Sequence, residues 1–288
     1  MASQRQLKAR IRSVKNTKQI TKAMQMVAAS KMRRAQDATK ASHPYEKAAG
    51  ELLAFLAQQG VTKEHKWFVE RPINSRMIIV IASDKGLAGA YNSNVLKAYL
   101  ADLRSDDKDS VKNTTIAVGR KASEFSSRLK GTQIAGTYEN IPDHPEGAQF
   151  YAILSAAKDA FETGEVDAVD VVYTKFVSSL TQVADTFRLF PAGSVIEDAT
   201  AVATETTFEP SPEEVLDDVA YRLIGSRLFQ ALLDARASEH SMRMLAMKNA
   251  TDNASGLVDD LTLAMNKARQ SAITQELAEI SGGAEAMK

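Results

Sequence analysis

Apolar residues at both ends of the chain recur with the three- and four-residue steps of a helix. Near the amino end these positions are Leu7, Ile11, Val14, Met24, Ala28, Met32 and Ala35. Near the carboxyl end they are Leu257, Leu261, Ala264 and Ala268 and, after a shift of face, Ile273, Leu277, Ile280 and Ala284. The pattern predicts a long amphipathic helix at each end, with a seam that departs from one strict heptad register.

The positions of the prolines set the extent of these helices. All seven lie between residues 44 and 212. Ser211, Pro212 and Glu214 form a helix-start signature, with a hydroxyl cap, a proline at the first helical position and a carboxylate at the third. We therefore expect helices from about Ser3 to Gln59 and from Pro212 to Lys288. At 1.5 Å rise per residue the first helix would be roughly 85 Å long, and some 70 residues of the second would extend roughly 100 Å.

The expected seam is thin and rich in alanine, which lets two helices approach closely. The simplest partner for each terminal helix is therefore the other, in antiparallel orientation. Four polar residues are expected on or near this seam, namely Lys18, Glu239, Asn249 and Asn253.

The central part of the chain alternates short apolar runs with helical patterns. The expected strands are Met77–Ser83, Thr114–Gly119, Asp167–Phe176 and Gln182–Phe190, and the expected helices are Val95–Leu103, Lys121–Leu129 and Gln149–Phe161. This alternation predicts a small Rossmann-like α/β domain inserted into a long antiparallel coiled coil. The predicted fold class is α/β, with a coiled-coil helix over residues 1–59, the α/β domain over 73–208 and a second coiled-coil helix over 211–288.

One loop is a candidate nucleotide site because it directly follows the first expected strand. It reads SDKGLAGAYN, from Ser83 to Asn92, and matches neither G-x-G-x-x-G nor G-x-x-x-x-G-K-[ST]. We favour a strand-to-helix turn in which Asn92 caps the next helix over a phosphate cradle.

Composition narrows the chemistry further. The 288 residues include no cysteine, which excludes disulfides, thiolate nucleophiles and thiolate metal sites. The four histidines are scattered without metal-ligand spacing, and the adjacent Asp259 and Asp260 diverge by about 100° on a helix. No apolar run approaches the ~18 residues of a membrane span. We predict no catalytic residue, no metal site and no cofactor.

Positive and negative residues are unevenly distributed along the chain, although its net charge is zero. The first 36 residues carry ten Lys and Arg and no Asp or Glu. A mitochondrial transit peptide has a similar composition, but the basic helical pattern continues toward Gln59 and favours a part of the mature fold.

Two interpretations remain from the residues alone: a mechanical coiled coil that meets an acidic protein surface, or a coiled-coil nucleic-acid-binding protein. Residues 1–42 contain no aromatic residue, which disfavours single-strand binding. A third and weaker interpretation is an α/β enzyme whose site is not recognised from the sequence.

Three stretches of the sequence resemble a known protein family. They are RIRSVKNTKQITKAMQMVAASKMRRAQ, SDKGLAGAYN and ASEHSMRMLAMKNATDNASGLVDDLTLAMNKARQSAITQELAEISGGAEA. In this order they resemble the gamma subunit of bacterial F-type ATP synthases over the whole chain. The middle block departs from the usual Arg-Gly-Leu-Cys-Gly-Gly, which appears here as residues 85–90, KGLAGA.

The resemblance implies a non-catalytic rotor shaft that transmits torque between a proton-driven c-ring and the catalytic beta subunits of an alpha3beta3 ring. The expected partners are the alpha and beta subunits, the epsilon subunit and the c-ring, with one copy of the chain per complex and no nucleic acid. Membrane association would come only through the Fo sector. The regulatory dithiol insertion of chloroplast members is absent, which excludes redox switching of that kind. The basic start looks unprocessed and favours a bacterial protein with a peripheral location on the cytoplasmic face of the membrane.

The resemblance also implies roles for single residues. The cations of the N-terminal helix would face acidic loops of the beta subunits. The implied beta-subunit contacts are Arg269, Gln270 and Thr274, together with Met24 and Arg243, which would influence coupling. The implied bearing residues at the top of the ring are Ile273, Leu277 and Ile280. The implied c-ring contacts are Phe208 and Glu209.

Overall fold

The computed structural model describes residues 4–58, 60, 62–63, 65–142, 147–193 and 211–285. The chain divides into two compact units, which we call the coil unit (Met1–Ala28 with Arg243–Lys288) and the sheet unit (Ala29–Met242). Two long helices, α1 (Gln4–Gln58) and α6 (Pro212–Glu285), contribute to both units. The long terminal helices expected from the apolar spacing are therefore confirmed. The division of the chain at residues 59, 73, 208 and 211 stays a prediction.

The sheet unit is built on five strands. They are β1 (Ser75–Ile81), β2 (Lys112–Val118), β3 (Gln133–Tyr138), β4 (Ala168–Phe176) and β5 (Gln182–Phe190). Their order in the sheet is β3-β2-β1-β4-β5; the first four are parallel and β5 is antiparallel to β4. This is the strand order of a Rossmann-like sheet, as predicted, with an antiparallel strand at one edge.

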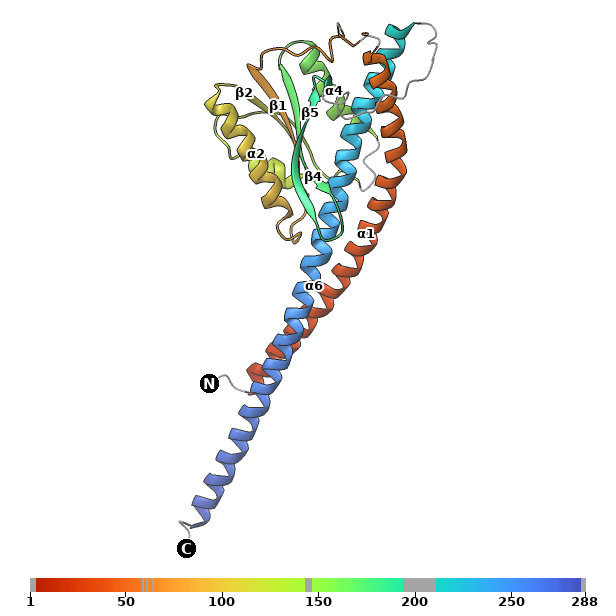
Figure 1. The fold of residues 1–288 in the computed structure, drawn as a ribbon. Coiled ribbons are helices and arrows are strands. Elements are labelled where there is room, and N and C mark those ends of the chain that lie inside the picture. The colour runs from red at the N-terminus through yellow and green to blue at the C-terminus, as the bar shows by residue number, and fades with distance from the viewer. Residues whose placement is uncertain are drawn as a thin grey trace. The chain divides into compact units, whose positions relative to one another are not determined.

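Helices cover both faces of this sheet (Figure 1). On one face lie α2 (Tyr91–Lys108) and α3 (Arg120–Ser126), which pack on Ile78, Val80 and Val172. On the other face lie α4 (Ala148–Glu162) and the parts of α1 and α6 that belong to this unit. Because successive side chains of a strand point to opposite faces, a strand buried on both sides reads as a continuous apolar run. The sequence MIIVI of β1 follows this rule.

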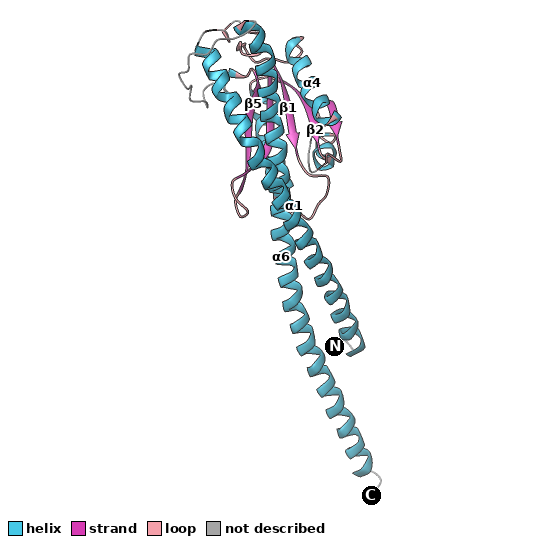
Figure 2. Ribbon diagram, turned by 90° about the vertical axis from the view of Figure 1, so that its right-hand side faces the viewer, coloured by secondary structure: helices cyan, strands magenta, loops and turns pink. Residues whose placement is uncertain are grey.

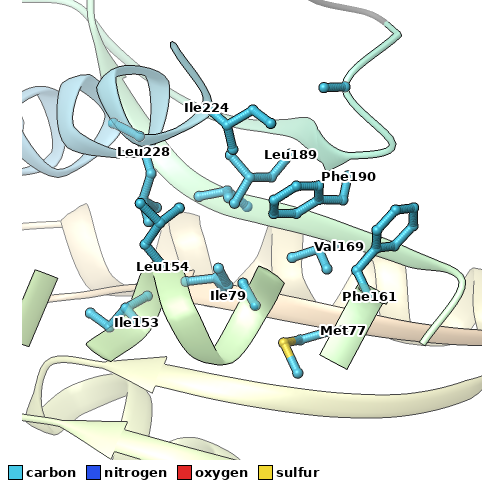
Figure 3. Close-up of a cluster of buried hydrophobic side chains, with 14 of the residues drawn as sticks. Met77, Ile79, Ile153, Leu154, Phe161, Val169, Leu189, Phe190, Ile224 and Leu228 are labelled. Carbon is cyan, nitrogen blue, oxygen red and sulfur yellow. The ribbon is translucent and has the colours of Figure 1, made fainter. Parts of the chain in front are cut away.

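The larger of the two cores lies on the α4 and α6 face. Figure 3 shows Met77 and Ile79 of β1 and Val169 of β4 facing Leu154 and Phe161 of α4, with apolar side chains of β5 and α6 beside them. These side chains are buried almost completely. Burial of each is worth about 1.5–3 kcal/mol, so this core fixes the sheet-unit part of α6 on the sheet.

Strand β3 was not expected from the sequence. It lies at the edge of the sheet, where it pairs only with β2, and most of its residues are exposed. An edge strand without a buried face shows no alternation of apolar and polar residues. The sequence QIAGTY therefore lacks the pattern that predicts a strand. The expected strands at β1, β2, β4 and β5 and the expected helices at α2, α3 and α4 are confirmed.

In the coil unit α1 and α6 lie side by side in antiparallel orientation (Figure 2). Their buried side chains are Leu7, Ile11, Thr21 and Ala28 on α1 and Met247, Thr251 and Ala254 on α6. Thr251 Oγ1 donates to Thr21 Oγ1 at 2.8 Å, so a pair of hydroxyl groups lies on the seam.

The predicted register of the C-terminal seam is wrong in part. Leu257 and Ala264 are exposed, whereas the buried row continues from Ala254 to the half-buried Val258 and Met265. Lys18, Asn249 and Asn253 are exposed as well, while Glu239 is buried but lies in the sheet unit. One reason is that Thr21 and Thr251 are buried on the seam and contact each other there, and polar residues are not counted in an apolar pattern.

Candidate interaction surfaces

The far end of α6 has no neighbouring helix in the part of the chain that the structure describes. Every residue from 271 to 281 is exposed. Ile273, Leu277 and Ile280 are 49%, 60% and 69% exposed and follow one another by four and three residues, so they share one face of the helix. An unpartnered apolar stripe of this kind is a surface that a protein partner would bury.

The three polar residues of the predicted beta-subunit contact lie beside this stripe. Arg269 is four residues before Ile273 and so lies on the same face, while Gln270 and Thr274 form the adjacent row. All three are exposed, and the Thr274 hydroxyl donates to the Gln270 carbonyl at 2.9 Å. The structure thus brings six of the predicted residues together on neighbouring rows: Arg269, Gln270, Ile273, Thr274, Leu277 and Ile280.

The other two predicted beta contacts lie on opposite helices of the coil unit. Met24 and Arg243 are both half-buried. Since Thr21 faces Thr251 in an antiparallel pair, the levels of Met24 and Arg243 differ by about five residues, or roughly 8 Å along the axis. They are therefore near one another but apart from the α6 end. The predicted c-ring contacts, Phe208 and Glu209, lie outside the described residues.

The first turns of α1 carry a dense positive surface. All seven of its Lys and Arg residues between positions 4 and 28 are exposed: Arg5, Lys8, Arg10, Arg12, Lys15, Lys18 and Lys22. Ile20, Met26 and Val27 are exposed on the same segment, each by more than half. This face therefore offers both charge and apolar area to a partner.

The candidate nucleotide loop of the sheet unit is a turn with its own internal contacts. Asn92 Oδ1 accepts hydrogen bonds from Ser83 N at 3.1 Å and from Ser83 Oγ at 3.0 Å. Helix α2 begins at Tyr91 with no side-chain cap. The expectation that Asn92 caps this helix is wrong, because its side chain turns back to the end of β1.

A carboxylate closes the crevice where a Rossmann-like sheet would receive a phosphate. Such ligands bind at the carboxyl ends of the parallel strands, against free backbone N–H groups. Here Asp84 Oδ1 accepts from Arg120 N at 3.1 Å and from Asn140 N at 3.0 Å. Asp84 Oδ2 lies 3.6 Å from Arg236 Nη2 of α6. A phosphate would meet a negative charge there and would find these two donors taken.

Sequence reasoning missed Arg236 altogether. Its side chain is only 13% exposed, and it also meets the Glu239 carboxylate at 2.9 Å and the Ile141 carbonyl. Burial lowers the pKa of Arg236, but Glu239, Tyr91 and Asp84 raise it more, so the guanidinium is held in its charged form. The sequence did contain a sign of this buried charge. The stretch DARASE has three charged residues within six positions, inside a segment whose other residues are typical of a buried helix.

A second ion cluster lies under α2. Arg76 contacts Asp106 at 3.1 Å and Asp170 at 3.4 Å, and Arg188 contacts Asp170 at 2.5 Å. Burial raises the pKa of Asp106, Arg76 lowers it, and the carboxylates of Asp102 and Asp170 raise it, with a net upward shift. The opposite charges of these partners lie close together between helix and sheet, although Arg76 Nε and Asp106 Oδ2 are buried without a hydrogen-bond partner among the described residues. We interpret the cluster as a structural contact between α2 and the sheet.

Neither a metal site nor a membrane span is found within the described ranges. No group of three or more His, Cys, Asp or Glu residues there is placed to hold a metal ion. No helix among these residues has both the length and the apolar character to cross a bilayer.

Comparison with known proteins gives matches over the whole length. A family model described as ATP synthase matches residues 3–287. The ATP synthase gamma chains of Stenotrophomonas maltophilia (strain R551-3) and Xanthomonas campestris pv. campestris (strain B100) are 40% and 39% identical over 288 residues, which is all of this chain and all of each relative.

Two solved structures share the fold. A chain of the central stalk and c-ring structure of the Tetrahymena thermophila mitochondrial ATP synthase aligns with a TM-score of 0.61 at 26% identity, over 80% of this chain and 99% of that chain. A chain of the Euglena gracilis mitochondrial ATP synthase aligns with a TM-score of 0.67 at 21% identity, over 99% of this chain and 94% of that chain.

Proposed function

The chain belongs to the ATP synthase gamma-chain family and works as the rotor shaft of that complex, and we propose which of its residues carry the torque. The chain itself performs no chemical step. Its partners are the alpha and beta subunits of the ring, the epsilon subunit and the c-ring, with one copy in each complex. Through them it is part of a membrane-associated assembly, and we place it on the cytoplasmic face of a bacterial membrane.

The observation that carries this proposal is the exposed end of α6. A continuous helix of 74 residues is about 110 Å long. Its last described turns have no partner helix among the residues that the structure describes, although they carry Ile273, Leu277 and Ile280 on one face. A shaft that turns inside a sleeve of other subunits requires such a projecting, unpartnered end. We assign these three residues to the bearing.

The residues beside the stripe are suited to contacts that form and break. Arg269 and Gln270 are exposed polar groups within one helical turn of Ile273. Hydrogen bonds from such groups exchange readily with water, so their net worth is only about 1 kcal/mol each. We propose that Arg269, Gln270 and Thr274 contact the beta subunits in turn as the shaft rotates.

The cations of α1 provide attraction over a longer range. Seven exposed charges within 25 residues act across a Debye length of about 8 Å at physiological salt. Coulomb energy falls off gradually with distance, whereas interdigitated apolar packing must be taken apart at each step. We propose that this face meets acidic surfaces of the beta subunits, with Met24 and Arg243 at the edge that influences coupling.

The energy scale requires a shaft of this kind. One proton that crosses the membrane supplies only about 2.3 kcal/mol per 100 mV. Several protons must therefore be combined for each ATP, and the rotor must hold their work without slipping. For the c-ring end we propose contacts through Phe208 and Glu209.

Native mass spectrometry of the chain with the alpha and beta subunits of its own organism tests the proposal. We expect a complex of three alpha, three beta and one copy of this chain. If folded alpha and beta subunits assemble while this chain stays apart, the shaft function is wrong. A parallel titration with duplex DNA at several salt concentrations checks the nucleic-acid alternative, for which we expect no saturable binding.

A further inference from the structure

Helix α6 changes its way of contacting the sheet in its last turns within the sheet unit. Up to Ala235 it packs with buried apolar side chains such as Leu228 and Leu232. From Arg236 onward it uses polar side chains. Ser238 Oγ donates to the Thr174 carbonyl at 3.1 Å, and in the next turn Ser241 bonds the hairpin that joins β4 and β5. The helix is thus attached at the carboxyl edge of the sheet by directional bonds.

Arg236 makes the most extensive of these attachments. Its Nη1 lies 2.9 Å from Glu239, its Nη2 donates to the Ile141 carbonyl, and the same nitrogen lies 3.6 Å from Asp84. Asp84 in turn accepts from the N–H groups of Arg120 and Asn140. One guanidinium therefore links α6 to the segments that follow β1, β2 and β3.

The chemistry of this cluster favours a positioning role. The side chains of Arg236 and Asp84 are 13% and 12% exposed, so water competes little for their contact. A planar guanidinium reaches several acceptors in fixed directions, which a lysine does not. Apolar packing resists separation but has no directional preference, whereas hydrogen bonds from Arg236 resist a twist of α6 against the sheet.

We propose that Arg236 and Asp84 form a torsional clamp that fixes α6 on the loops at the carboxyl edge of the sheet. The clamp rests on the rotor function proposed above, because its purpose is to pass twist between the sheet and the shaft helix. Arg236 acts through Asp84 and touches neither nucleotide nor a reacting group, so it is a positioning residue.

Hydrogen exchange in the full-length chain tests the clamp without any assumption about rotation. In Arg236→Met the amides of Arg120 and Asn140, which depend on a well-placed Asp84, are expected to exchange about tenfold faster. The amides of Ile79 and Val80 in the central strand serve as the reference for overall stability. We expect Arg236→Lys to give an intermediate rate. Equal acceleration at all four amides, or none at Arg120 and Asn140, would overturn the clamp.

If Arg236→Met does not fold, a second variant tests the clamp. Asp84→Asn retains an oxygen for the two N–H groups but removes the charge that faces Arg236. In the assembled complex, held by its ring and with a probe on the sheet unit, Asp84→Asn is expected to increase the angular fluctuation of the probe. The matched control is Glu139→Gln, which removes an exposed ion pair with Arg120 at 3.3 Å and leaves α6 untouched.

These outcomes separate the two proposals. If the wild-type chain does not enter the ring, the rotor function fails and the exchange experiment still judges the clamp. If the wild-type complex assembles and Asp84→Asn fluctuates no more than Glu139→Gln, the clamp is wrong and the rotor function stands.

Discussion

The substitution Leu277→Ala is expected to lower the affinity of the chain for the ring without changing the stability of the free chain. Leu277 is 60% exposed in the chain alone, so its truncation creates no cavity and the melting temperature of the free chain should not change. Full burial of a leucine is worth about 1.5–3 kcal/mol, and the exposed share leaves about 1–2 kcal/mol to be gained on entering a bearing. That amount corresponds to a factor of about 5–30 in binding.

Competition measures this factor directly. Equal amounts of wild-type and variant chains, distinguished by mass, are offered to a limiting quantity of alpha–beta ring, and native mass spectrometry counts which chain is incorporated. Gln275→Ala is the matched control, because residue 275 lies roughly 160° around the helix from Leu277. Equal incorporation of Leu277→Ala and wild type would refute the assignment of this stripe to the bearing.

Three further predictions concern the fold that supports the shaft. Gly119 has φ +89°, and an added Cβ would lie 2.2 Å from the Ala82 carbonyl oxygen, so Gly119→Ala should cost about 3 kcal/mol or more in urea unfolding, and a smaller loss would contradict this backbone path. Thr21→Val and Thr251→Val should each cost about 1 kcal/mol, while the double variant is close to neutral, and a thermal double-mutant cycle with additive losses would argue against the hydroxyl pair. Burial raises the pKa of Asp167, but hydrogen bonds from Asn74 and Ser75 and the charge of Arg71 lower it more, and the net shift is downward. The ionised form therefore stabilises the fold above the unfolded-state pKa, and this contribution is lost as pH falls through the lower folded-state value. Asp167→Asn should be less stable than wild type at neutral pH and equal to it at the acid end of a pH series; a difference that stays constant with pH would contradict this.

The sequence predicted the elements whose burial is strong and repetitive. MIIVI of β1 has no alternative to a strand buried on both faces, and the absence of proline after Pro212 left α6 free to run to its end. Edge strand β3 was not predicted, because pairing with β2, rather than burial of its own side chains, keeps it in place.

The contacts between distant segments were harder to predict. Arg236 and Asp84 are separated by 152 positions, and no local pattern links them. The register of the coil was misjudged for a related reason, since the Thr21 and Thr251 hydroxyls contact each other only when both helices are in place. The apolar row at Ile273 and Leu277 was recognised from its spacing and its bearing role from family resemblance, and its contacts with other subunits stay a prediction.

Direct observation of rotation is the most direct test of the shaft function. The alpha–beta ring is fixed to a surface, a probe is attached to the sheet unit of this chain, and ATP is supplied. The account predicts that the probe turns in one direction and pauses at three positions in each revolution, one for each beta subunit. A probe that stays still while the same complexes hydrolyse ATP would contradict the claim that this chain is the rotor shaft.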